Sequence, residues 1–131
     1  MAAIPDGFRD ILDKKTFAHL ATRMKDGSPQ VSPVWIERDG DRLLVNSAKG
    51  RLKDRNIRAD GRVAISATDP DNPYRALMIR GRVVAILEEG ADEQIDRLAK
   101  KYLGKDKYPF RTADEVRVKY VIEPTRVTTM G

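Results

Sequence analysis

The chain contains no cysteine and only one histidine among its 131 residues. Without thiols it can form no disulfide, has no thiolate nucleophile and cannot build a zinc site with cysteine ligands. One imidazole also leaves too few nitrogen ligands for a histidine-rich metal centre. Any redox chemistry in this chain therefore requires a bound cofactor.

Long apolar runs are also missing. No stretch approaches the roughly 18 apolar residues of a membrane-spanning helix, and residues 1–7 lack the basic and apolar regions of a signal peptide. We therefore expect a cytoplasmic chain without membrane insertion. Its 40% hydrophobic and 34% charged residues are typical of a globular protein. The length predicts one domain over residues 1–131.

Positive charge is concentrated in one segment. Residues 49–62 hold six basic and two acidic side chains, a net +4 of the chain's +5. Acidic residues are interspersed through the rest of the sequence, and no aromatic residues alternate with the basic segment. The pattern therefore favours a small anionic ligand over nucleic acid.

The basic segment has the form of a phosphate clamp. Gly50 permits a tight turn, and a helix over about 51–59 would direct its unpaired N–H groups toward an anion. Arg51 and Lys53 would add charge-assisted hydrogen bonds. The alternative is that this short basic helix is only a solvated surface.

Alternating apolar residues predict a sheet. Hairpin turns are expected at 25–28 and 38–41, Pro33 belongs at a sheet edge or bulge, Gly81 marks a bend, and Pro124 should end a strand. The predicted fold class is mainly β (α+β), an antiparallel barrel of six to seven strands with short flanking helices. The predicted strands are 16–24, 29–36, 42–47, 62–68, 74–87, 116–122 and 125–130, and the helices are 6–13, 51–59 and 90–102.

Three runs in this order resemble a known superfamily: Leu20-Ala21-Thr22, the run from Asp26 to Trp35, and the run from Arg51 to Ile57. The chain is similar to the pyridoxamine 5'-phosphate oxidase-like, FMN-binding split-barrel proteins from about Ile11 to Val127. It most resembles the B-type, F420-dependent flavin/deazaflavin oxidoreductases of actinobacteria. The resemblance implies a split β-barrel and a homodimer with cofactor sites at the subunit interface.

The resemblance also implies a set of cofactor-binding residues. Arg51 and Lys53 would hold the cofactor phosphate, and Asn56 would support their turn. The remaining implied residues line the approach (Asn46, Ser47, Lys49), face the tricyclic ring (Ser32, Pro33, Val34), or reach the site from the opposite subunit (Tyr74, Arg75, Met78).

Coenzyme F420 is the expected cofactor, with FMN as the alternative. The acidic oligoglutamate tail of F420 would match the positive charge around Arg55, Arg58 and Arg62. The function that the resemblance implies is transfer of a hydride from reduced F420 to an electron-poor conjugated substrate such as an enone, quinone or tetrapyrrole. Alternatives are an FMN-dependent reductase or oxidase of the same fold and a non-catalytic cofactor carrier.

Three single residues have competing interpretations. His19 shares a strand face with Phe17 and Ala21, so we expect it to pack rather than to transfer protons. Trp35 is expected in the core or an interface, with the wall of a binding site as the alternative. Tyr74 could donate a hydrogen bond to a substrate carbonyl or simply pack in an interface. No metal ligand set and no catalytic residue can be assigned.

Overall fold

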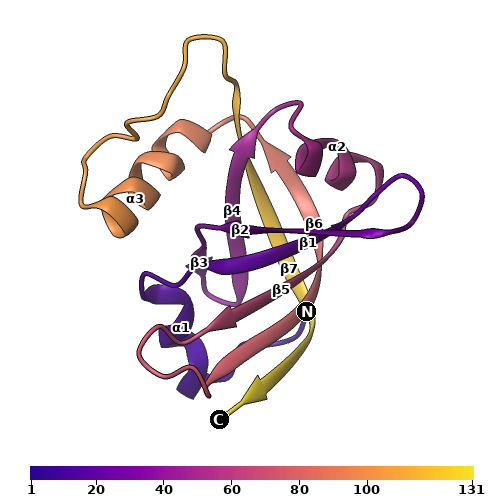
Figure 1. The fold of residues 1–131 in the computed structure, drawn as a ribbon, viewed down its shortest axis with the longest axis vertical. Coiled ribbons are helices and arrows are strands. Elements are labelled where there is room, and N and C mark those ends of the chain that lie inside the picture. The colour runs from indigo at the N-terminus through magenta and orange to yellow at the C-terminus, as the bar shows by residue number, and fades with distance from the viewer.

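Two strands that follow each other in the chain form opposite edges of one sheet. In the computed structural model, which describes residues 1–131, the strand order is β2-β1-β5-β6-β7-β4-β3. Only Trp35 and Ile36 connect β2 (Pro29–Val34) to β3 (Glu37–Asp39). The two edges must therefore lie close together, and the sheet curls into a barrel that stays open between them (Figure 1). The predicted antiparallel split β-barrel is confirmed.

The other elements follow the predicted order closely. A single 3₁₀ turn, Asp6–Phe8, leads into α1. The helices are α1 (Arg9–Asp13), α2 (Leu52–Ala59) and α3 (Ala91–Leu103), and the remaining strands are β1 (Ala18–Arg23), β4 (Arg42–Ala48), β5 (Arg62–Thr68), β6 (Ala76–Leu87) and β7 (Arg117–Met130).

The last strand corrects one prediction. Pro124 does not end it, because β7 runs continuously through this position and pairs with β6 on both sides. The register shifts there, so that Arg80 lies opposite Arg126 while Gly81 lies opposite Pro124. This bulge accommodates a residue that has no N–H to donate. The two strands predicted over 116–122 and 125–130 are therefore one strand. The total remains seven because residues 37–39, which were expected to lead into a turn, form the short strand β3.

The predicted turn and edge residues lie where their backbone chemistry requires. Gly27 and Gly40 have φ angles of +92° and +61° in the two hairpins, a region that side chains disfavour. Pro33 lies on β2, which pairs only with β1 and leaves its other side unpaired. A proline is tolerated on such an edge because the strand does not need every donor.

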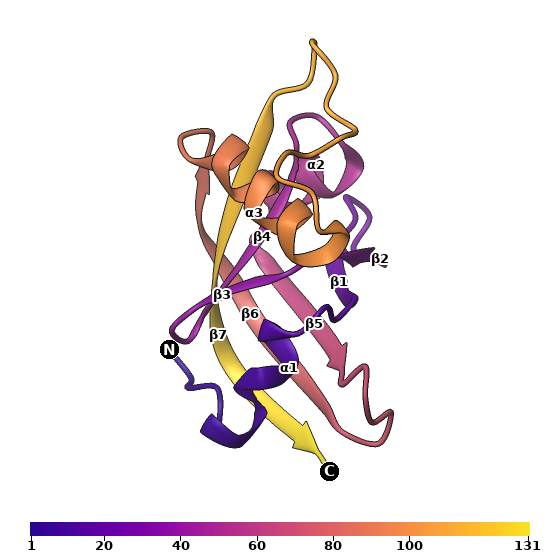
Figure 2. The same cartoon turned by 90° about the vertical axis from the view of Figure 1, so that its left-hand side faces the viewer.

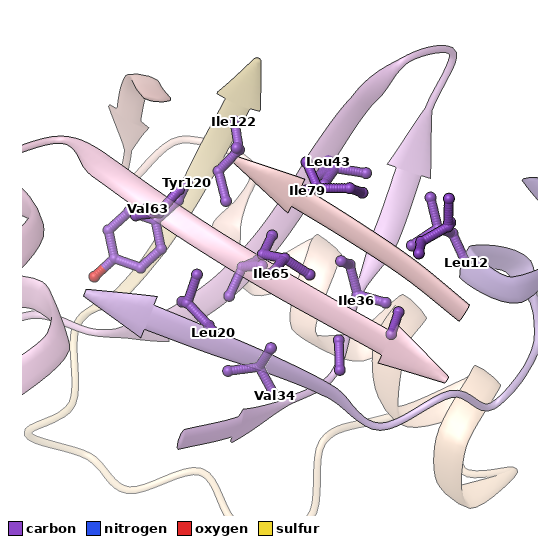
Figure 3. Packing of buried hydrophobic residues seen from close by; sticks show 14 of the residues in the cluster. Leu12, Leu20, Val34, Ile36, Leu43, Val63, Ile65, Ile79, Tyr120 and Ile122 are labelled. Atoms are coloured by element: carbon purple, nitrogen blue, oxygen red, sulfur yellow. The ribbon is translucent and has the colours of Figure 1, made fainter. Parts of the chain in front are cut away.

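The barrel interior is filled by one apolar cluster, to which β1, β4, β5, β6 and β7 all contribute side chains (Figure 3). Helices α2 and α3 lie toward one end of the barrel and α1 toward the other (Figures 1 and 2). Tyr102 of α3 joins the linker between β2 and β3 to the segment before β1: its hydroxyl accepts from Ile36 N–H at 3.1 Å and donates to the Thr16 carbonyl at 2.6 Å. The end that carries α2 and α3 holds the site described next.

Candidate functional site

The turn between β4 and α2 presents free backbone donors. Gly50 has a φ of +89°, which lets the chain reverse direction before the helix. The amide groups of Leu52, Lys53 and Asp54 donate to no backbone oxygen, as expected for the first turn of a helix. No side chain caps this helix N-terminus. The turn thus has the backbone features that the clamp hypothesis requires.

A buried carboxylate fixes this turn to the barrel. Asp54 is 1% exposed and accepts from Gly50 N–H at 2.9 Å, Arg58 Nε at 2.9 Å and the Tyr120 hydroxyl at 2.6 Å. Burial alone would raise the pKa of Asp54, but these three donors hold it below its ordinary value. The turn, the helix and β7 are therefore joined at one ionised group.

A cavity of about 270 Å³ opens beside the turn. Strands β2, β4 and β7, helices α2 and α3, and the loop between α3 and β7 contribute to its wall. The lining residues are Phe17, Pro33, Val34, Trp35, Asn46, Arg51, Lys53, Ile95, Leu98, Tyr108, Phe110 and Arg117. Cations at one part of the lining and apolar side chains at the rest give the cavity an amphipathic character.

Three cations converge in this cavity. Arg51 and Arg117 both contact Glu115, at 3.3 Å and 2.5 Å. Burial lowers the pKa of the Lys53 ammonium, and the neighbouring Arg51 and Arg117 guanidinium groups lower it further. Three positive groups with one carboxylate leave a local excess of positive charge, which suits an anionic ligand.

Arg117 is held in place from several directions. Its Nε donates to Asn46 Oδ1 at 2.9 Å, and its guanidinium lies 5.1 Å from the centre of the Tyr108 ring. Asn46 in turn donates to the Ala91 carbonyl at 2.8 Å and to Gln94 Oε1 at 2.9 Å. The N-terminal end of α3 therefore positions an arginine that belongs to β7.

Aromatic rings form much of the apolar wall. Trp35 stacks on Tyr102 with a centroid distance of 5.2 Å and an interplanar angle of 6°. Tyr108 meets Trp35 edge-on at 6.1 Å, and Phe110 meets Tyr108 at 5.7 Å. Stacked and edge-on pairs of this kind hold rings in defined orientations. Trp35 thus packs on its neighbours and lines the cavity at the same time.

The structure brings five of the residues implied by the resemblance to this cavity: Pro33, Val34, Asn46, Arg51 and Lys53. Ser32 is their half-buried neighbour on β2, and its hydroxyl has no hydrogen-bond partner. Ser47 is 1% exposed and does not line the cavity. It follows Asn46 on β4, and successive strand residues point to opposite faces.

Two residues near the turn have other contacts. Lys49 is exposed and pairs with Glu88 at 3.4 Å, outside the cavity. Asn56 is buried and donates to the Thr22 hydroxyl at 3.0 Å and to the Met24 sulfur at 3.3 Å. Asn56 therefore fastens α2 to β1, whereas support of the turn itself comes from Asp54.

The three residues expected from an opposite subunit do not line this cavity in their own chain. Tyr74 is 79% exposed. Arg75 donates to Asp10 at 2.6 Å and to Asp69 at 2.8 Å, and lies over the Phe8 ring at 4.9 Å. Arg75 therefore stabilises the N-terminal helix of its own chain. Met78 is exposed on the outer face of β6.

Two further expectations need correction. His19 does not pack in the core; it is exposed and lines a separate cavity with Met78. The basic segment is also less available than its charge suggested, because Arg58 pairs with Asp54 and Arg62 pairs with Asp60. Of the three arginines expected near an oligoglutamate tail, only Arg55 has no carboxylate partner in the chain.

Sequence reasoning missed several residues of the cavity: Phe17, Ile95, Leu98, Tyr108, Phe110 and Arg117. It also missed Glu115, which contacts two of the cavity's cations. Ile95 and Leu98 lie within the helix predicted over residues 90–102, but apolar side chains on a helix indicate by themselves only packing. Tyr108 and Phe110 lie between the helix predicted over 90–102 and the strand predicted over 116–122, where the sequence predicts no regular element. Two aromatic residues close together in a polar loop were the available signal.

Comparisons with known proteins agree with this architecture. A solved structure named F420 reductase is 38% identical over 95% of this chain and 98% of its own, with a TM-score of 0.85. A conserved hypothetical protein from Mycobacterium tuberculosis (23% identical, TM-score 0.71, 99% and 88% covered) and an FAD-binding protein from Mesorhizobium loti (20% identical, TM-score 0.70, 98% and 95% covered) share the fold. No curated protein matches the chain.

The barrel and its cationic, aromatic-lined cavity define a split-barrel protein of the flavin-binding type. The sequence profile of pyridoxamine 5'-phosphate oxidase matches residues 4–131, and the chain belongs to that family. The family supports an oxidoreductase with a flavin-type cofactor. None of the three helices is long and apolar enough to cross a bilayer.

Proposed function

We propose that this protein is a reductase that uses reduced coenzyme F420 to deliver a hydride to an electron-poor conjugated substrate, such as an enone, quinone or tetrapyrrole. The observation that carries the proposal is the convergence of Arg51, Lys53 and Arg117 with free helix amides beside an aromatic wall. The 38% identity to a protein named F420 reductase supports the deazaflavin as the cofactor.

The residues present fit such a cofactor in two respects. Arg51, Lys53 and the amides at the start of α2 would take its phosphate, since arginine forks and helix N-termini both suit phosphate oxygens. The backbone at Pro33 and Val34, together with the Trp35 side chain, would flank its tricyclic ring. When bound, the reduced deazaflavin supplies the hydride itself.

The chain's own part is then positioning and exclusion of water. The Trp35–Tyr102 stack and the apolar residues of α3 would keep one side of the ring dry. Asn46 would hold Arg117 at the edge of the cavity, where its guanidinium can face a developing or fixed negative charge. Because the cofactor would supply the hydride, the protein needs no catalytic thiol or imidazole, which agrees with a chain that has no cysteine and has its only histidine outside the cavity.

A homodimer is part of the proposal. A cavity of about 270 Å³ is smaller than the roughly 300–1,000 Å³ of complete small-molecule sites, so a second wall is needed. Exposed apolar side chains at Phe17, Val31, Met78 and Phe110 would suit contact with a second copy. Tyr74, Arg75 and Met78 of that copy are the residues proposed to complete the site. Arg75 has the least support among them, because it is ion-paired with Asp10 and Asp69 in its own chain.

An FMN-dependent reductase or oxidase is the second candidate, favoured by the family match. The two candidates are separated by a turnover assay with the purified protein. We expect the protein to catalyse the oxidation of reduced F420 by a quinone such as menadione. The reaction is followed by the return of the absorbance of the oxidised deazaflavin. Turnover with reduced FMN but not with reduced F420 would replace the proposal with the second candidate.

A further inference from the structure

A second cavity, with a strongly basic lining, lies on the sheet away from the site described above. It has a volume of about 580 Å³ and shares no lining residue with the cavity beside α2. We call it the arginine groove, and five arginines line it: Arg23, Arg62, Arg80, Arg82 and Arg126. The other lining residues are mostly small (among them Ala21, Ala64, Gly27 and Gly81), so the guanidinium groups dominate its surface.

The strand register places these arginines against one another. Arg62 on β5 lies directly opposite Arg82 on β6, and Arg80 on β6 lies directly opposite Arg126 on β7. Like charges in directly opposed positions destabilise a sheet, and arginine cannot lose its charge near neutral pH. Two such pairs on one face create a repulsion that a bound anion would offset.

The chain itself supplies little of that compensation. Asp60 pairs with Arg62 at 2.6 Å and with Arg23 at 3.7 Å. Glu123 on β7 lies opposite Arg82 in the register, but its carboxylate pairs with Arg42 at 2.9 Å. In the single chain, Arg80, Arg82 and Arg126 are exposed and have no carboxylate within ion-pair distance; Arg80 and Arg126 also line the adjoining cavity that contains Met78. The middle of the groove therefore holds three unpaired guanidinium groups, with Arg80 and Arg82 two residues apart on one strand.

We propose that the arginine groove binds a small molecule carrying linked phosphate groups. Alternate residues on a strand are about 7 Å apart and neighbouring strands about 5 Å apart, so the three arginines can surround adjoining phosphates. A terminal phosphate offers three acceptor oxygens and nearly two negative charges, whereas a carboxylate offers two oxygens and one charge, so linked phosphates match several guanidinium groups better. The lining has no aromatic side chain on which bases could stack, which favours a small anion over single-stranded nucleic acid.

Calorimetric titration of the purified full-length protein with inorganic tripolyphosphate, at fixed moderate salt, tests this proposal. We expect orthophosphate to bind at least tenfold more weakly. The double variant Arg80→Gln with Arg126→Gln should lose at least tenfold in tripolyphosphate affinity. Its matched control, Lys15→Gln with Lys105→Gln, removes two exposed positive charges outside the groove and should stay within twofold of the wild type.

A melting experiment separates loss of the site from loss of the fold. Because the Arg80/Arg126 variant removes a repulsive pair, its melting temperature without ligand should equal or exceed that of the wild type. Tripolyphosphate should raise the melting temperature of the wild type and leave that of the variant unchanged.

Three results would overturn the proposal. One is undiminished tripolyphosphate affinity in the Arg80/Arg126 variant. Another is an equal loss in the Arg51→Ala, Lys53→Ala variant, which would move the anion to the cavity beside α2. The third is tighter binding of free tri-γ-glutamate than of tripolyphosphate, which would make the groove a carboxylate site.

Discussion

The Tyr120 hydroxyl on β7 donates to Asp54 Oδ1 on α2 at 2.6 Å, and both side chains are buried. This hydrogen bond connects the centre of the barrel to the helix whose first turn carries Arg51 and Lys53. The same carboxylate accepts from Gly50 N–H. The Asp54 side chain is therefore a positioning group: its carboxylate fixes the backbone that the proposed clamp depends on.

Asp54→Asn should destabilise the protein by about 2–4 kcal/mol, because it puts an amide nitrogen against buried donors and removes the partner of Arg58. Tyr120→Phe loses one hydrogen bond and should cost about 1 kcal/mol. Urea unfolding of the two variants measures both values. Equal stability of Asp54→Asn and wild type would show that the carboxylate does not hold the turn.

The bulge in β6 and β7 makes Gly81 sensitive to substitution. A Cβ at this position would lie 2.8 Å from the Glu123 carbonyl oxygen and 2.9 Å from Ile122 Cγ2. Gly81→Ala should therefore destabilise the protein by about 1–3 kcal/mol. Gly7→Ala, whose Cβ meets no atom within 4 Å, is the control and should shift the unfolding midpoint little. Similar midpoints for both variants would contradict the tight packing at the bulge.

The lowered pKa of Lys101 predicts that the free energy of unfolding rises at alkaline pH. Its ammonium donates to the Leu12 and Ile36 carbonyls, and burial lowers its pKa to about 8, against about 10.4 in an unfolded chain. Between these values the unfolded state binds more protons than the folded state. The free energy of unfolding contributed by this group therefore increases as the pH rises through that window.

The measurement is the melting temperature of the wild type and of Lys101→Met from pH 7.5 to 10.5. Other groups titrate in this range, so the difference between the two curves is the relevant quantity. We expect the wild type to gain relative to the variant as the pH increases. Parallel curves would mean that Lys101 keeps an ordinary pKa in the fold.

Glu115 competes with any anion for the cations of the cavity, because it contacts both Arg51 and Arg117. Glu115→Gln keeps the shape of the side chain and removes its charge. We expect coenzyme F420 to bind about three- to tenfold tighter, a gain of about 1 kcal/mol. Glu123→Gln, which removes a carboxylate paired with Arg42, should leave the affinity unchanged. Unchanged or weaker binding by Glu115→Gln would argue against an anion among these cations.

Local patterns predicted most of the fold. Alternation along residues 62–68 predicted β5 with its observed bounds, and the helix predicted over 90–102 lies within one residue of α3 at each end. Pro124 misled because a proline is incompatible with a regular ladder but compatible with a bulge. The bulge depends on Gly81, which lies 43 positions away in the chain and opposite Pro124 in the sheet.

The site was less predictable because it depends on which charges pair. The charge pattern of residues 49–62 indicates one cationic surface, yet the fold pairs Lys49, Arg58 and Arg62 with carboxylates away from the site. Arg51, which contacts Glu115, and Lys53 line the cavity instead. Arg117 joins them because β7 pairs with β4 at Ala48. The groove of opposed arginines likewise follows from strand register, which composition does not encode.

The most direct test of the proposed function is a titration of the purified protein with coenzyme F420 and, separately, with FMN. Quenching of Trp35, the only tryptophan in the chain, reports binding because this side chain lines the cavity. We predict F420 binding at micromolar affinity or better, weaker FMN binding, and loss of F420 binding in the Arg51→Ala, Lys53→Ala variant at an almost unchanged melting temperature. Tighter binding of FMN, or binding of neither cofactor, would contradict the account.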